Sequence, residues 1–168
     1  MTGAVIAQRT VQQHVLKRAL LAFVSSAGLF VAGLASADKK PVAMLPEPAA
    51  LMILIRSTIA ALNHANLTNN YFTFRDLGTA EFQRTTSPEK LSQQLKPFRD
   101  QGLDLSPVFA VTPVLDQPPV LARDGTLELA GHFPTSPLKI TFRLAFQNVN
   151  QRWRHSAVVV GAEPVSAR

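Results

Sequence analysis

Cysteine is absent from this chain of 168 residues, and its absence excludes several kinds of chemistry. The chain can form no disulfide, no thiolate metal site and no cysteine nucleophile, and it has no cysteine to carry a lipid at an export junction. Its eight glycines stand singly, so no glycine-rich phosphate loop is present. Folding must therefore depend on an apolar core, for which a hydrophobic content of 46% is sufficient.

Acidic residues are missing from the first 37 positions, which contain the basic residues Arg9, Lys17 and Arg18. The formal charge of the whole chain is +6, but the rest of the chain has 14 basic and 11 acidic side chains, a net charge of +3. This balance is typical of an ordinary soluble surface. We therefore expect no nucleic-acid partner.

The N-terminal segment has the order of features found in a secretory signal peptide. Residues 19–35 carry no charge and are rich in Leu, Val, Phe and Ala, and Ala35-Ser36-Ala37 places small residues before charged Asp38. We predict cleavage after Ala37 and a periplasmic or secreted protein without stable membrane insertion. The alternative is a retained anchor, because about 17 apolar residues are the short limit for a membrane span; the chain would then be a membrane-tethered subunit of an envelope complex.

Residues 38–48 are rich in proline and predict a linker, and residues 49–165 predict one domain that begins with helices. A helix from residue 49 buries apolar positions spaced three and four apart, whereas Arg56, Asn63 and His64 fall outside that face. Polar residues 66–70 end it, and a shorter helix over 71–83 turns three hydrophobic residues inward. A third helix begins at Ser87-Pro88. The expected buried positions of the three helices are Leu51, Leu54, Ile55, Thr58, Ile59 and Leu62, then Phe72, Leu77 and Phe82, then Leu91, Leu95 and Phe98.

After residue 103 the hydrophobic pattern changes to a period of two, which is typical of strands. We predict strands over 108–115, 127–133, 140–146 and 153–160, with a loop over 117–124. The fold class is therefore α+β, with about three N-terminal helices packed on a curved antiparallel sheet of about four strands.

Three segments carry a resemblance to a known superfamily: Leu127-Glu-Leu-Ala-Gly-His-Phe133, Ile140-Thr-Phe-Arg-Leu-Ala-Phe146 and the ending with Trp153-Arg154. They resemble the last three strands of the nuclear-transport-factor-2-like (cystatin-like) superfamily. Four other stretches resemble uncharacterised exported bacterial members: Asn66–Tyr71, Arg75–Gly78, Ser87–Leu91 and Leu103–Ser106. The resemblance implies a cone-shaped domain whose open sheet face is often used to form a homodimer. It does not select a function, because the superfamily includes isomerases, dehydratases and proteins that only bind or assemble.

Catalytic residues are not evident. A ketosteroid-isomerase-like site needs a tyrosine and two acids inside the cone, but the sole tyrosine, Tyr71, has its nearest acid at Asp76, and Glu128 falls on the polar sheet face. The histidines lack metal-ligand spacing, so we expect no metal and no cofactor. If Trp153 points inward, alternation sends His155 and Ala157 inward as well.

We accordingly predict a non-catalytic exported binding or assembly protein. The alternative is a small-molecule-binding protein or an isomerase-like or dehydratase-like enzyme that holds a small apolar ligand with His155, Trp153 and Tyr71. Lys139, Arg143 and Arg154 are the candidate partner-binding residues, since they can form a basic strip on the wet sheet face. Small residues on that face, such as Ala130, Thr141, Ala145 and Ser156, favour a homodimer through it.

Overall fold

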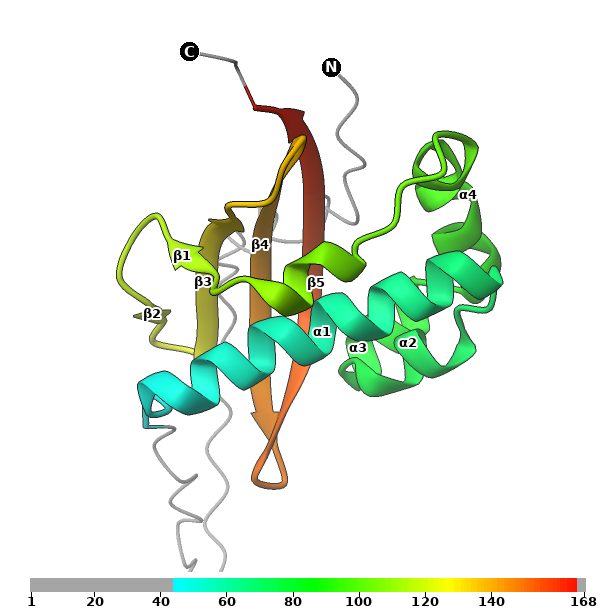
Figure 1. Ribbon diagram of the computed structural model, residues 1–168. Coiled ribbons are helices and arrows are strands. Elements are labelled where there is room, and N and C mark those ends of the chain that lie inside the picture. Colours follow the sequence, from blue (N-terminus) through cyan, green and yellow to red (C-terminus); the bar gives the residue numbers. More distant parts are fainter. Residues whose placement is uncertain (1–43, 166–168) are drawn as a thin grey trace, which may run out of the picture.

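The computed structural model describes residues 44–165 (Figure 1). The predicted signal peptide, residues 1–37, lies outside the described residues, as does most of the predicted linker, residues 38–48.

The described part of the chain begins with four α-helices and one 3-10 helix. They are α1 (Pro48–Thr68), α2 (Phe72–Leu77), α3 (Ala80–Thr85), α4 (Pro88–Asp100) and η1 (Ser106–Ala110). Side chains cap two of them: the Thr79 hydroxyl accepts from the Phe82 amide at the start of α3, and the Ser87 hydroxyl accepts from the Lys90 amide at the start of α4. The predicted start of the third helix at Ser87-Pro88 is thus confirmed.

Five antiparallel strands follow: β1 (Val114–Leu115), β2 (Val120–Leu121), β3 (Thr126–Phe133), β4 (Leu138–Val149) and β5 (Arg152–Pro164). The order is β1-β3-β4-β5, and β2 pairs with the same edge of β3 as β1. The long strands β4 and β5 form a hairpin at one side of the sheet, with β5 at its edge (Figure 1).

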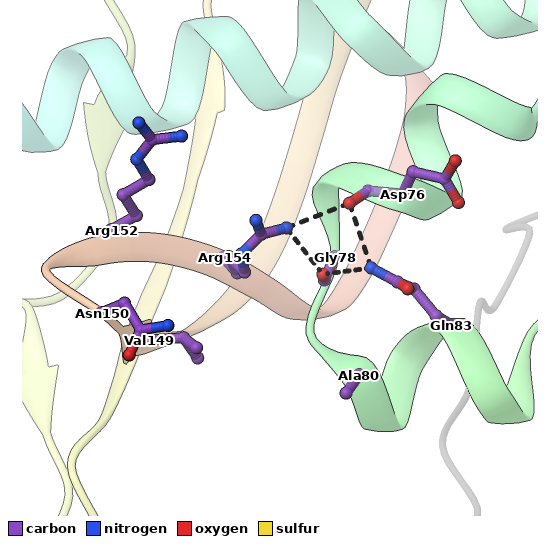
Figure 2. A pocket seen from close by; sticks show the side chains of 8 residues that line it. All are labelled: Asp76, Gly78, Ala80, Gln83, Val149, Asn150, Arg152 and Arg154. Carbon is purple, nitrogen blue, oxygen red and sulfur yellow. Dashed lines mark hydrogen bonds between the residues drawn. The ribbon is translucent and has the colours of Figure 1, made fainter.

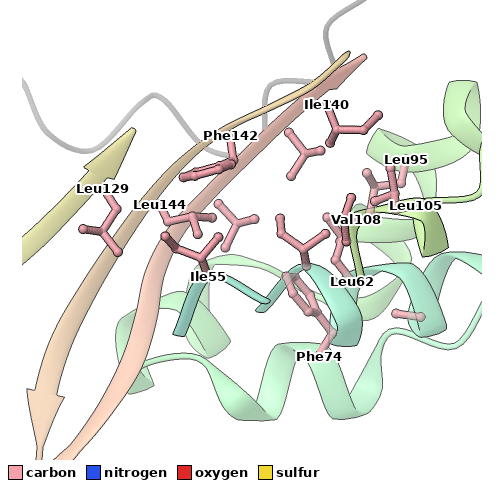
Figure 3. Packing of buried hydrophobic residues seen from close by; sticks show 14 of the residues in the cluster. Ile55, Leu62, Phe74, Leu95, Leu105, Val108, Leu129, Ile140, Phe142 and Leu144 are labelled. Carbon is pink, nitrogen blue, oxygen red and sulfur yellow. The ribbon is translucent and has the colours of Figure 1, made fainter. Parts of the chain in front are cut away.

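The helices cover one face of this sheet, which confirms the α+β class. Alternate residues of β3 and β4, such as Leu129, Phe142 and Leu144, meet helical residues such as Ile55 and Leu62 in one core (Figure 3). By length and composition alone α1 is apolar enough to cross a membrane, but here its apolar side is part of this core. The opposite face of the sheet, which we call the outer face, is covered by no helix of residues 44–165 (Figure 1).

The predicted helix over 71–83 is wrong, because the chain breaks it in two at Gly78, which is extended with ψ of 175°. The hydrophobic face therefore restarts after the break. Phe72 and Leu77, expected inside, are 57% and 49% exposed, and Phe74 is buried in their place. Of the three residues expected inside this stretch, only Phe82 is buried.

The first helix ends where expected, but one of its residues differs from expectation. It ends at Thr68, inside the polar stretch 66–70 that was predicted to end it, and it closes at Asn69 with φ of 51°. Asn63, expected outside the buried face, is fully buried. Its amide nitrogen donates to Asp104 and Ser106 and its oxygen accepts from the Leu105 amide, so burial leaves no polar atom of this side chain unpaired.

The predicted strand over 108–115 is also wrong over most of its length. Ser106-Pro107 starts the 3-10 helix η1, and only Val114 and Leu115 pair with β3. Here the chain passes close over Gly131, where a Cβ atom would lie 2.2 Å from the Val114 carbonyl oxygen. The predicted loop over 117–124 contains the two-residue strand β2.

A β-bulge changes the alternation of the last strand. Phe146 pairs with His155 and Ala145 pairs with Ala157, so Ser156 is the extra residue. As a result His155, Val158 and Val160 are buried, whereas Ala157, expected inside, is only half-buried. The inward direction of His155 is confirmed and that of Ala157 is wrong.

Candidate functional site

A pocket of about 560 Å³ lies beside the turn between β4 and β5 (Figure 2). We call it the turn pocket. One wall comes from the end of the β4–β5 hairpin and the other from the link between α2 and α3. Its lining residues are Asp76, Gly78, Ala80, Gln83, Val149, Asn150, Arg152 and Arg154.

Local backbone geometry sets the two walls. Asn150 and Gln151 have φ of 51° and 64°, the left-handed pair that a two-residue hairpin turn of type I′ requires. On the other side, the Thr79 amide donates to the His155 carbonyl at 2.9 Å. This bond attaches the α2–α3 link to the free edge of β5 and keeps the two walls together.

Two side chains hold the α2–α3 link at the pocket. Nη1 of Arg154 donates to the carbonyl oxygens of Asp76 at 3.0 Å and Gly78 at 3.4 Å. Nε2 of Gln83 donates to the same two oxygens at 3.0 Å each (Figure 2). The Arg154 guanidinium is therefore fixed in place by main-chain acceptors rather than by an acid.

The charges at the turn pocket do not cancel locally. Its one acidic side chain, Asp76, accepts from Nε and Nη2 of Arg75 at 2.9 and 2.7 Å. Within residues 44–165, the Arg152 side chain makes no hydrogen bond or ion pair, and Arg154 has no carboxylate partner. The pocket therefore has two arginines whose positive charge no neighbouring carboxylate neutralises.

His155 lies beneath this pocket in an aromatic cluster. Its ring stacks on Phe74 with 4.7 Å between centroids and meets the edge of Phe82 at the same distance. Burial, and secondly the charge of Arg154, lower the pKa of His155 from 6.5 to about 4, although interaction of the ring with the Phe74 backbone carbonyl opposes this shift. Its Nε2 has no hydrogen-bond partner among the described residues. A Cβ added to Gly78 would lie 3.0 Å from that atom, so the backbone of Gly78 separates the ring from the pocket.

The other two predicted ligand-binding residues lie in different surroundings. The Tyr71 hydroxyl donates to Asn66 at 2.9 Å and accepts from Arg99, and burial raises the pKa of Tyr71 although Arg99 opposes the shift. Trp153 is half-buried against the core. The turn pocket contains none of the three, and a second pocket of about 530 Å³ contains Tyr71 without His155 or Trp153. A joint ligand-binding role for them stays a prediction.

The predicted partner-binding residues are also in unlike environments. Lys139 pairs with Glu163 at 2.9 Å, Arg143 is exposed, and Arg154 bonds to the α2–α3 link. Between residues 44 and 165, no three His, Asp or Glu side chains gather as a metal-binding group.

The sequence pattern does not indicate Asp76, Gly78, Gln83 or Asn150 as pocket residues. The one local signal was Gly78, a lone glycine inside a helical pattern, which often marks a break. Comparison with known proteins finds no matching family model, no similar curated protein and no similar solved structure. Function is therefore inferred from the geometry.

Proposed function

We propose that this chain is an exported, non-catalytic binding or assembly protein with a cone-shaped, nuclear-transport-factor-2-like fold, and that it forms a homodimer through the outer face of its sheet. The observation that carries the proposal is the contrast between the two sheet faces. The helix-covered face is filled by packed side chains, whereas no helix of the described part covers the outer face.

The filled side argues against a reaction chamber. The residues that would line a cavity beside His155, including Leu129, Phe142 and Phe146, are each at most 2% exposed. His155 itself is held between two phenylalanine rings. A substrate would have to displace this packing, and close-packed cores resist such a change.

The outer face has the composition of a surface that can pack against a copy of itself. Its middle rows present Ala130, Ala145 and Ala157, and near the β1–β2 edge Val114 and Val120 are 46% and 44% exposed. Small side chains let two sheets approach to the usual distance of about 10 Å.

Opposite charges on the outer face suit a two-fold arrangement. Glu128 pairs across the sheet with Ala145, and Arg143 lies two residues before Ala145 on the same strand. Among residues 44–165 neither charge has an ion-pair partner. In a two-fold dimer every contact between two different residues occurs twice. Arg143 of each copy can therefore face Glu128 of the other copy.

Light scattering coupled to gel filtration of the purified protein tests the dimer. We expect a dimer mass for the unchanged protein, a monomer for Glu128→Arg and for Arg143→Glu, and a dimer again for the double variant. Gln93→Glu, at an exposed position of α4, is the control and should remain a dimer. A monomer mass for the unchanged protein, or no recovery in the double variant, would refute the contact.

Export is tested separately with the full chain in a bacterial host. Cell fractionation should place the protein outside the cytoplasm, and mass spectrometry should find Asp38 as its first residue. A cytoplasmic protein that retains residues 1–37 would overturn export. An exported protein that retains them would instead support a membrane tether.

A further inference from the structure

We propose that the turn pocket binds the anionic group of a small ligand, a carboxylate or a phosphate, through Arg152 and the free edge of the Arg154 guanidinium. The proposal concerns the end of the β4–β5 hairpin, and it does not depend on the outer-face dimer.

Arg154 is already positioned for such a group. A guanidinium has five N–H donors, and Nη1 uses its two on the carbonyl oxygens of Asp76 and Gly78. Nε and Nη2 have no partner in the described residues and are not buried. This edge of an arginine is the fork that binds two oxygens of a carboxylate or phosphate. Because the side chain is fixed in the folded protein, a ligand loses little affinity to ordering it.

Arg152 supplies a second positive charge next to the fork. It lies two residues before Arg154 on the same strand, so both side chains leave the same face of β5. Figure 2 shows Arg152 extending freely, with no dashed bond to any pocket residue. The side-chain amide of Asn150, in the adjacent turn, offers a neutral donor on the same wall.

The acid in the pocket does not oppose an anion at this position. Figure 2 shows that the carbonyl oxygen of Asp76 faces Arg154, while its carboxylate points away from Arg154. That carboxylate is neutralised by two bonds from Arg75. The anion would therefore meet two uncompensated cations and a carboxylate whose charge is already paired.

The pocket also sets the kind of ligand. Val149, which is 38% exposed, and Ala80 give an apolar side to a space of about 560 Å³, which is much larger than one phosphate or carboxylate group. We therefore expect an acidic head group attached to a short apolar part. Inorganic phosphate should bind more weakly than butyl phosphate, because it buries no apolar surface.

Calorimetric titration of the purified protein with inorganic phosphate, butyl phosphate and butanoate, at one low ionic strength, tests the proposal. We expect saturable one-site binding of butyl phosphate, butanoate or both, and the tighter of the two identifies the head group as phosphate or carboxylate. Arg152→Gln should weaken that binding about tenfold, the effect of losing one charged hydrogen-bond donor. Arg123→Gln, which removes an exposed arginine that does not line the pocket, should leave it unchanged.

The variant Arg154→Lys tests whether the anion needs the paired donors of the guanidinium or only its positive charge. Lysine retains the positive charge but lacks the planar pair of donors, so binding should weaken while the far-ultraviolet circular dichroism spectrum stays unchanged. Saturation with none of the three probes at millimolar concentration overturns the proposal. An equal loss in Arg123→Gln and Arg152→Gln also overturns it, since that result would mean attraction to net charge alone.

Discussion

Protonation of His155 should control the stability of this protein between pH 5 and 7. The folded state holds the imidazole between Phe74 and Phe82, and there burial and the Arg154 charge lower its pKa from 6.5 to about 4. In the unfolded chain the pKa returns to about 6.5. The unfolded state therefore binds more protons throughout this interval, so the free energy of unfolding rises with pH.

The size of the effect follows from the two pKa values. The contribution of His155 is fully present above pH 6.5 and is lost as the pH falls toward the folded-state value of about 4. Linkage between protonation and folding lowers the free energy of unfolding by about 2 kcal/mol at pH 5 and by about 3 kcal/mol at pH 4. Asp104 and Asp124 add little above pH 5, because hydrogen bonds with Ser106 and Thr126 lower their pKa values from 3.8.

Urea unfolding at pH 5 and pH 7 measures this loss, with the fluorescence of Trp153, the only tryptophan, as the signal. His155→Leu removes the titrating group at similar volume, so its free energy of unfolding should lose most of the pH dependence. His132→Gln is the control and should keep it, because it leaves the buried imidazole in place. The reasoning would be refuted if the unsubstituted protein had equal stability at both pH values. It would also be refuted if the free energy of unfolding of His155→Leu fell by the same amount from pH 7 to pH 5.

Three further substitutions should lower the free energy of unfolding in urea titrations at pH 7. Gly78→Ala should cost about 1–3 kcal/mol by overpacking, because its Cβ would lie 2.6 Å from a Phe82 ring carbon; an unchanged midpoint would contradict that contact. Asn63→Ala should cost about 1–3 kcal/mol, because it leaves the buried Leu105 amide without its acceptor. Ser87→Ala should cost about 1 kcal/mol through loss of the helix cap, and Ser87→Thr should retain most of that amount.

The regular parts of the fold were predictable from the sequence because each follows one period. The α+β class, the strands at β3 and β4, and the helix starting at Ser87 all follow from local pattern and capping. The helix over 71–83 failed because a single extended residue, Gly78, resets the helical phase without changing the composition around it. The strand over 108–115 failed for another reason: its partner is only the short segment at Gly131, a long-range contact that local pattern does not encode.

The candidate site was less predictable, because its parts come from segments about 75 residues apart. Arg154 was identified as basic, but its role depends on main-chain carbonyls of Asp76 and Gly78, and carbonyl groups are present at every residue. His155 was expected to point inward, yet its closeness to Phe74 required the broken helix that the pattern did not show. Side-chain identity therefore indicated which groups carry charge, whereas the tertiary fold determines what they contact.

The bulge at Ser156 links the core to the turn pocket. Strict alternation back from buried Val158 and Val160 would turn Arg152 and Arg154 toward the core, where two unpaired charges are very costly. The extra residue reverses the phase between Ala157 and His155, so the valines and the histidine are buried while both arginines stay at the surface. The same residue places the His155 carbonyl at the free edge of β5, where the Thr79 amide binds it and closes the α2–α3 wall. Because the inward–outward alternation of side chains shifts within β5, one strand contributes apolar residues to the core and two arginines to the proposed anion site.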